Sequence, residues 1–189
     1  MKYFFLLLLT ASAAQAKDIQ PLFEALRDSG EKYSVVGTVC EQVAKLDMQQ
    51  IYPAPQYTVI TGIQYGTKKR VIGELDVIVF QNDSKKAILV GEVKCYQDPH
   101  AGISKAREQR TRFLSAIRSK TSLLMACLGK PCTVSERNFK GIQQFISIGQ
   151  EGTKSAGFDV ELNYSLDDLM ALRAQLMECQ DKGECARPE

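Results

Sequence analysis

The chain is poor in the residues that build several common kinds of active site. It has one histidine, His100, and none of its six cysteines belongs to a C-x-x-C pair, which argues against a zinc site. It also lacks a His-Asn-His cluster, a glycine-rich phosphate loop and a Gly-x-Ser-x-Gly turn. These absences disfavour histidine-centred nucleases, nucleoside triphosphatases and serine hydrolases.

Long hydrophobic runs are also missing, except at the N-terminus. There the chain begins Met-Lys, continues with an uncharged and largely apolar stretch, and reaches Ala-Gln-Ala at residues 14–16. This is the pattern of a secretory signal peptide with an A-x-A cleavage site, and it is shorter than the roughly 20 residues that span a bilayer. We therefore expect residues 1–16 to be removed and residues 17–189 to be secreted or periplasmic, exported from a bacterium, with no stable membrane association.

Residues 17–189 have the length of one domain, and all six cysteines lie within them. In an oxidising compartment an even number of cysteines indicates disulfides. Six cysteines allow fifteen pairings, so the sequence alone proves none of them. Closeness in sequence favours Cys127 with Cys132 and Cys179 with Cys185, which leaves Cys40 for Cys95.

The spacing of apolar residues predicts an α/β domain. Period-3.6 patterns predict helices at residues 18–27, 34–50 and 101–120, a continuation at 123–128, and a last helix from Ser165 to about Cys179. Val35 and Val36 belong to the apolar stripe of the second helix. Period-2 or continuous apolar patterns predict strands at residues 57–63, 71–80, 87–95, 142–148 and 158–162.

Acidic and basic side chains interrupt two neighbouring strands of this pattern. Asp76 lies in the second strand, and Glu92-Val93-Lys94 lies in the third. Alternate residues of a strand face the same way, so Glu92 and Lys94 share one face while Val93 and Cys95 share the other. A hairpin between the two strands brings Asp76 across from Glu92 and Lys94. Two carboxylates and an ammonium are therefore expected to converge.

This combination suits the hydrolysis of phosphodiester bonds with a divalent ion. Oxygen ligands from Asp76, Glu92 and the main chain near Val93, completed by waters, fit Mg²⁺, with Mn²⁺ as a substitute. Lys94 can orient or deprotonate the attacking water, or hold a phosphate oxygen. The expected cofactor is therefore Mg²⁺.

These motifs resemble the PD-(D/E)XK nuclease superfamily, whose members have the restriction-endonuclease-like fold. The resemblance implies a three-layer α/β core in which a mixed β-sheet is flanked by helices. The resemblance rests on residues 73–76, which read Gly-Glu-Leu-Asp, and on the Glu-Val-Lys triplet at 92–94. Leu75 stands where the family often has proline, which many members replace. The resemblance implies a metal-dependent nuclease with Asp76, Glu92 and Lys94 as catalytic residues.

Two further positions extend the resemblance beyond the triplet. Glu41, in the helix before the strands, is similar to an acidic residue that many members use as an additional metal ligand or to bind water. Gln109-Arg110-Thr111-Arg112 resembles a Q-x-x-R signature whose side chains approach the site or the phosphate. The resemblance thus implies supporting roles for Glu41, Gln109 and Arg112.

Basic residues are concentrated in the middle of the chain, although the formal net charge is only +2. Residues 68–120 contain twelve Lys or Arg against six Asp or Glu. Such a stretch can face phosphates, and Lys68, Lys69 and Arg70 at a hairpin turn can grip a nucleic-acid backbone together with Arg112. We expect a nucleic-acid substrate, DNA rather than RNA, with low sequence specificity. The oligomeric state stays open.

Two other kinds of protein remain compatible with the sequence. One is an inactive nuclease-fold module that binds nucleic acid, and the other is a disulfide-stabilised extracellular interaction protein. Three local features are also expected. Glu74 faces away from the site, His100 lies in a loop, and the tail beyond Cys185 is mobile.

Overall fold

The computed structural model describes residues 17–119, 123–128, 132–142 and 144–188. The expected signal peptide, residues 1–16, lies outside these described residues. The elements follow in the order α1 (Gln20–Leu26), α2 (Thr38–Ile51), β1 (Tyr57–Thr67), β2 (Arg70–Gln81), β3 (Lys86–Lys94), α3 (Pro99–Arg118), β4 (Leu124–Cys127), η1 (Glu136–Phe139), β5 (Gln144–Gly149), η2 (Lys154–Ala156), β6 (Val160–Glu161) and α4 (Leu166–Lys182).

One six-stranded sheet organises the fold, with the strand order β4-β1-β2-β3-β5-β6. β1, β2 and β3 form an antiparallel meander, and β4 pairs antiparallel with β1 at one edge. β5 runs parallel to β3, and β6 runs parallel to β5. Parallel neighbours need a long connection, and α3 lies within the one between β3 and β5. The α/β class with a mixed sheet flanked by helices is confirmed.

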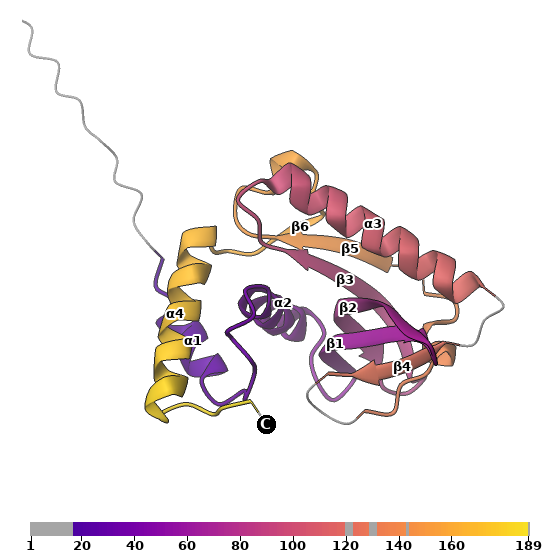
Figure 1. Ribbon diagram of the computed structural model, residues 1–189, viewed down its shortest axis with the longest axis horizontal. Helices are drawn as coiled ribbons and strands as arrows, with labels where there is room; N and C mark the ends of the chain where they lie inside the picture. The colour runs from indigo at the N-terminus through magenta and orange to yellow at the C-terminus, as the bar shows by residue number, and fades with distance from the viewer. Residues whose placement is uncertain (1–16, 120–122, 129–131, 143, 189) are drawn as a thin grey trace, which may run out of the picture.

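Helices cover both faces of the sheet, so apolar side chains form two separate cores. On one face α2 packs against the strands, with α1 and α4 beyond it, around buried residues such as Val43, Val77 and Leu172. On the other face α3 and η1 cover residues such as Ile63 and Phe113. Figure 1 shows α3 lying along one side of the sheet and α2 on the opposite side. The sheet is therefore the middle of three layers.

α2 begins later than the apolar pattern predicts. Its first residue is Thr38 and its N-cap is Gly37, whereas the pattern placed the helix start at Ser34. Val35 and Val36 therefore precede the helix, and they are 54% and 56% exposed instead of forming part of its buried stripe. The prediction for these two valines was wrong because turns just before the helix, including the bond from Thr38 N to Val35 O, carry them outward.

The apolar segment at 123–128 is a strand and not the expected helix. Leu124–Cys127 forms β4, whose residues pair with residues 63–66 of β1. An isolated run this short satisfies its main-chain groups better at a sheet edge than in a single helical turn. The partner strand is about sixty residues away, which is why local periodicity did not reveal it.

His100 belongs to the first turn of α3, so its expected place in a loop was also wrong. Asp98 is the N-cap, and its side chain accepts hydrogen bonds from the main-chain nitrogens of His100 and Ala101. Pro99 occupies the first helical position, where its fixed φ angle and missing N–H are tolerated. The Asp-Pro pair is therefore a helix start.

Three disulfides join the cysteine pairs that closeness in sequence favoured. Cys40 and Cys95 tie the start of α2 to the residue after β3, with 6.4 Å between their Cα atoms. The other bridges, Cys127–Cys132 and Cys179–Cys185, close short segments. Disulfides of this number fit an oxidising compartment. Within the described residues, no helix is both long enough and apolar enough to cross a membrane.

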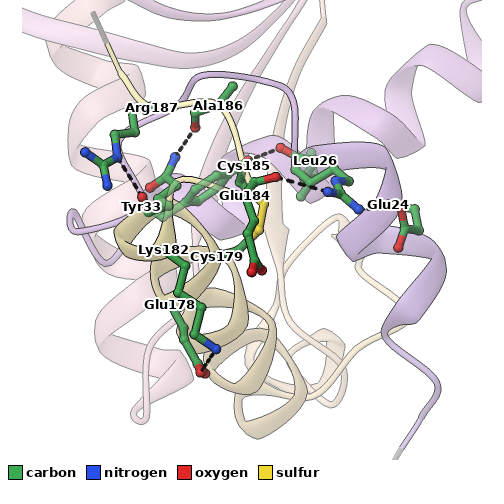
Figure 2. Close-up of a disulfide and its surroundings, with 12 residues drawn as sticks. Glu24, Leu26, Tyr33, Glu178, Cys179, Lys182, Glu184, Cys185, Ala186 and Arg187 are labelled. Atoms are coloured by element: carbon green, nitrogen blue, oxygen red, sulfur yellow. Dashed lines mark hydrogen bonds and ion pairs between the residues drawn. A yellow bond between two sulfur atoms is a disulfide. The ribbon is translucent and has the colours of Figure 1, made fainter.

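The C-terminal tail beyond α4, which the sequence predicts to be mobile, turns back along the helix. Figure 2 shows how the Cys179–Cys185 bridge reverses the chain. Arg187 Nε then donates to Gln180 O at 2.6 Å, and Gln180 Nε2 donates to Ala186 O at 2.8 Å. These contacts hold the tail beside α4 as far as Arg187.

Candidate active site

The β2–β3 hairpin carries the acidic and basic side chains that the sequence singled out. Val77 pairs with Gly91 and Ile78 with Val90, so the same register places Asp76 opposite Glu92. Both carboxylates are buried, at 4% and 3% exposure. Burial of two acidic residues inside a sheet costs free energy unless partners compensate, which makes this point of the fold a candidate site.

Lys94 connects the two carboxylates. Its Nζ lies 2.5 Å from Asp76 Oδ2 and 3.7 Å from Glu92 Oε2, and it also donates to Val93 O at 2.9 Å. Val93 N donates to the same Asp76 oxygen at 2.8 Å. Asp76, Glu92 and Lys94 are thus brought together as the strand geometry predicts, while Val93 and Cys95 pack on the α2 side of the sheet.

The alternation of side chains along β2 breaks at Asp76. Leu75 belongs to the core under α3, whereas Val77 belongs to the core under α2, although residues two apart normally share a face. Their partners on β1 are Ile63 and Thr61, and Gly62 between them has φ of 69°. The irregularity therefore lies directly beside Asp76.

Glu92 is the buried carboxyl group of the hairpin whose burial is least compensated. Neither of its carboxylate oxygens has a hydrogen-bond partner among the described residues. Burial, and then the neighbouring Asp76, raise its pKa to about 9, against an ordinary value of 4.5. Burial lowers the pKa of Lys94, but Asp76 outweighs this effect and the net shift is upward. Glu92 therefore keeps its proton at neutral pH unless a further cation joins Lys94 beside the two carboxylates.

A cleft of about 1520 Å³ opens beside these residues, between α2 and α3. Asp76, Val93 and Lys94 contribute to its lining from the sheet. Glu41 lines it from α2 and Gln109 lines it from α3, while Glu92 lies buried next to Asp76 and Lys94. Four of the five expected catalytic residues therefore line the cleft, and the fifth, Glu92, lies buried behind them.

Glu41 and Gln109 add polar groups from the two helical layers. Glu41 lies in the first turn of α2, next to the disulfide at Cys40. Burial, followed by the charges of Asp76 and Glu74, raises its pKa to about 8. The Oε1 atom of Gln109 is buried without a partner among the described residues. Both side chains can accept a ligand group that the protein itself does not supply.

Glu74 belongs to the site, although the sequence predicted that it faces away from it. It lines the same cleft as Asp76, and its pKa is raised first by burial and then by the charge of Asp76. Strand period does not explain this, because the alternation breaks between Leu75 and Val77. The expectation that Glu74 faces away from the site was wrong.

The basic residues expected to hold phosphates lie elsewhere. Lys68, Lys69 and Arg70 are exposed at the β1–β2 turn, and Arg112 is exposed on α3; none of the four lines the cleft. The lining instead contains six carboxylates and four cations, namely Asp28, Glu31, Glu41, Glu74, Asp76 and Asp98 with Lys32, Lys94, Lys105 and Arg187. The cleft is therefore acidic, although the surrounding stretch of sequence is basic.

The donor set fits a hard divalent cation. Glu92 is a buried carboxylate without a donor, and a cation beside it and Asp76 removes much of the cost of burying both. The described residues contain no group of three or more His, Cys, Asp or Glu side chains spaced to hold a metal ion. A cation here would therefore take two carboxylates, from Asp76 and Glu92, and complete its shell with main-chain oxygen and water.

Comparisons with protein-family models, with curated proteins and with solved structures found no match to this chain. The site is consequently defined by its own geometry. Its features are a buried pair of carboxylates, one ammonium that bridges them, and a cleft that reaches Asp76 and Lys94.

Proposed function

We propose that this protein is an exported, metal-dependent nuclease that hydrolyses phosphodiester bonds in the cleft between α2 and α3. The proposal includes a restriction-endonuclease-like arrangement of the core, as the resemblance to PD-(D/E)XK nucleases implies. DNA is the favoured substrate, cleaved with low sequence specificity. The three disulfides support an oxidising location.

One observation carries the proposal: Glu92 is buried beside Asp76, and no residue that the structure describes donates a hydrogen bond to either of its oxygens. A structural ion pair would need only one carboxylate for Lys94, and the 2.5 Å contact with Asp76 already supplies it. A second buried carboxylate is destabilising in the absence of a cation. Such strain is retained at sites where a ligand relieves it.

The side chains divide the chemistry among themselves. Asp76 and Glu92 would hold Mg²⁺. The main-chain oxygen of Val93, which accepts a hydrogen bond from Lys94, and the carboxylate of Glu41 are further oxygen groups beside them. When bound, Mg²⁺ supplies charge stabilisation for the phosphate oxygens. The ammonium of Lys94 orients the attacking water or holds a phosphate oxygen. Gln109 offers an unpartnered oxygen that can accept a hydrogen bond from that water.

The direct test incubates the purified protein with plasmid, linear duplex, single-stranded DNA and RNA, each with Mg²⁺ or with a chelator. We expect cleavage that requires Mg²⁺ and disappears in Asp76→Asn. Asp83→Asn is the matched control, because Asp83 is an exposed aspartate in the turn between β2 and β3. Loss of cleavage in both variants would indicate a contaminating enzyme or a general defect.

A second readout measures the metal without catalysis. Mg²⁺ at about 100 times its Kd stabilises a protein by about 2.7 kcal/mol, which corresponds to a rise in Tm of roughly 5 to 10 °C for this size. Asp76→Asn should abolish that rise, and Asp83→Asn should keep it. Nucleic-acid binding without cleavage or metal response would favour the inactive binding module, and no binding at low salt would favour an interaction protein.

A further inference from the structure

Exposed apolar side chains gather around the cleft. Seven large hydrophobic residues are exposed among the described part of the chain, and four of them line the cleft: Val35, Val36, Tyr96 and Leu128. The other three are Ile51, Val71 and Leu124, which lie outside its lining. Exposure of apolar surface beside a polar site is costly and indicates a ligand with apolar surface of its own.

Tyr96 is held in a defined position close to the ammonium of the site. It follows Lys94 by two residues and is 43% exposed. Its main-chain oxygen accepts a hydrogen bond from Gln150 Nε2 at 2.6 Å, and its ring edge lies against Gly102, where an added Cβ would be 3.4 Å from Tyr96 Cδ2. The preceding residue, Cys95, is fixed by its disulfide. The tyrosine is therefore an anchored aromatic surface at the cleft wall.

Leu128 supplies an apolar surface on the other side of the acidic residues. Its main-chain nitrogen donates a hydrogen bond to Gly62 O at 2.8 Å. A Cβ atom added at Gly62 would lie 3.3 Å from Leu128 Cβ, so the two residues are in contact. Gly62 is the β1 residue beside Asp76, and β2 lies between β1 and β3 in the sheet. Leu128 and Tyr96 thus flank Asp76 and Lys94 from opposite sides.

The charges of the cleft distinguish between forms of nucleic acid. A duplex presents two phosphate backbones and keeps its bases stacked inside, so it offers little to an apolar wall. The lining holds six carboxylates against four cations, so it repels phosphates, and it repels a duplex more than a single strand because a duplex brings two phosphate backbones. A single strand exposes base faces, and stacking on an aromatic ring contributes to binding for any base. The lining therefore matches a single strand.

We propose that the cleft selects single-stranded nucleic acid, with an unpaired base stacked on Tyr96 next to the phosphate at Lys94. Val35, Val36 and Leu128 contact the neighbouring bases and sugars. This inference rests on the proposed nuclease function for its cleavage step, but its binding step can be measured separately.

Binding is measured in chelator, where no cleavage occurs, by fluorescence anisotropy of one labelled oligonucleotide, single-stranded or annealed to its complement. We expect the single strand to bind at least about tenfold more tightly, and Tyr96→Ala to weaken its binding about tenfold, as one stacked base contributes. Tyr96→Phe should restore binding because the ring remains. Ile51→Ala is the control, since Ile51 is equally apolar and exposed but lies outside the cleft.

A base analogue whose fluorescence is quenched by stacking reports directly whether a base lies on the ring, provided that circular dichroism shows each variant to be folded. Quenching by the wild type and Tyr96→Phe, but not by a folded Tyr96→Ala, supports the proposal. Equal affinity for duplex and single strand, or unchanged binding in Tyr96→Ala, overturns it. In Mg²⁺, cleavage of duplex at least as fast as single strand overturns it while the nuclease assignment survives. Absence of all cleavage with Tyr96-dependent binding intact overturns only the nuclease assignment.

Discussion

The two halves of β2 show how differently charge behaves at the surface and inside the sheet. The strand starts beside the exposed basic turn of Lys68, Lys69 and Arg70, and a few residues later it carries the buried Asp76. Exposed charges are screened by water and salt, whereas buried charges shift the pKa values of their neighbours. Local net charge in a sequence is therefore a poor guide to the site, and burial is the better one.

The largest expected effect comes from the buried half. Asp76→Ala, Glu92→Ala and Lys94→Ala should each lower the cleavage rate by at least about a hundredfold, the usual loss when one electrostatic contact to a transition state is removed. Single-turnover kinetics with Mg²⁺ measure the loss, and circular dichroism checks the fold. Glu41→Gln and Gln109→Ala should cost less, because both act from the helices beside the hairpin. Near-wild-type rates for any of the first three would remove that residue from the mechanism.

Two of the disulfides are expected to stabilise the fold by different amounts. Cys40–Cys95 spans 55 residues and joins the layers that carry Glu41 and Lys94, whereas Cys179–Cys185 spans 6 residues. The chain-entropy model gives about 4 kcal/mol for the first loop and about 2 kcal/mol for the second. Replacing both cysteines of the first bridge by alanine should lower stability more, and it should also slow cleavage.

The double variant lacking Cys179 and Cys185 is the matched control, because that bridge holds the tail and not the hairpin. Chemical denaturation and cleavage rates measured on both double variants separate the two contributions. Unchanged activity after loss of the Cys40–Cys95 bridge would show that the hairpin and α2 keep their register without it.

Local spacing predicts the hairpin well because its parts are close in sequence. Asp76, Glu92 and Lys94 follow from strand alternation and one tight turn. The cleft walls do not follow from spacing. Tyr96 is anchored by Gln150, and Arg187 reaches the lining through the reversed tail, so both depend on packing between distant segments. The late start of α2 was missed for a related reason: Gly37 provides no side-chain cap that the sequence could reveal.

Replacing the Glu92 carboxyl group by an amide should affect stability and cleavage in opposite directions. Glu92→Gln keeps the shape but removes a carboxyl group that must take up a proton when it is buried, so in chelator the variant should be at least as stable as wild type while cleaving far more slowly. The pKa of Glu92 is about 9 in the folded protein and near 4.5 when unfolded. An acid with a raised folded pKa contributes most stability below its unfolded pKa, and this contribution is lost as pH rises toward the folded value.

The Tm advantage of Glu92→Gln over wild type should therefore grow between about pH 5 and pH 9 in chelator. Thermal melts across this range measure it, and Mg²⁺ should reduce the difference by stabilising only the wild type. A constant difference across the range would show that Glu92 is not the group responsible.

The smallest effect on cleavage is expected at the exposed basic turn from which β2 starts. Replacing Lys68, Lys69 and Arg70 by serine removes three exposed charges outside the cleft, so no interaction with the reacting phosphate is lost. Exposed cations act over distance and are screened within about 8 Å at physiological salt, so they assist encounter rather than chemistry. We expect kcat to stay within about twofold, and KM to rise only a fewfold at low ionic strength, with the difference vanishing as salt is added. Steady-state kinetics at two salt concentrations test this. A large fall in kcat would mean that the turn reaches the scissile phosphate in the bound complex, and the contrast between the two halves of the strand would then be wrong.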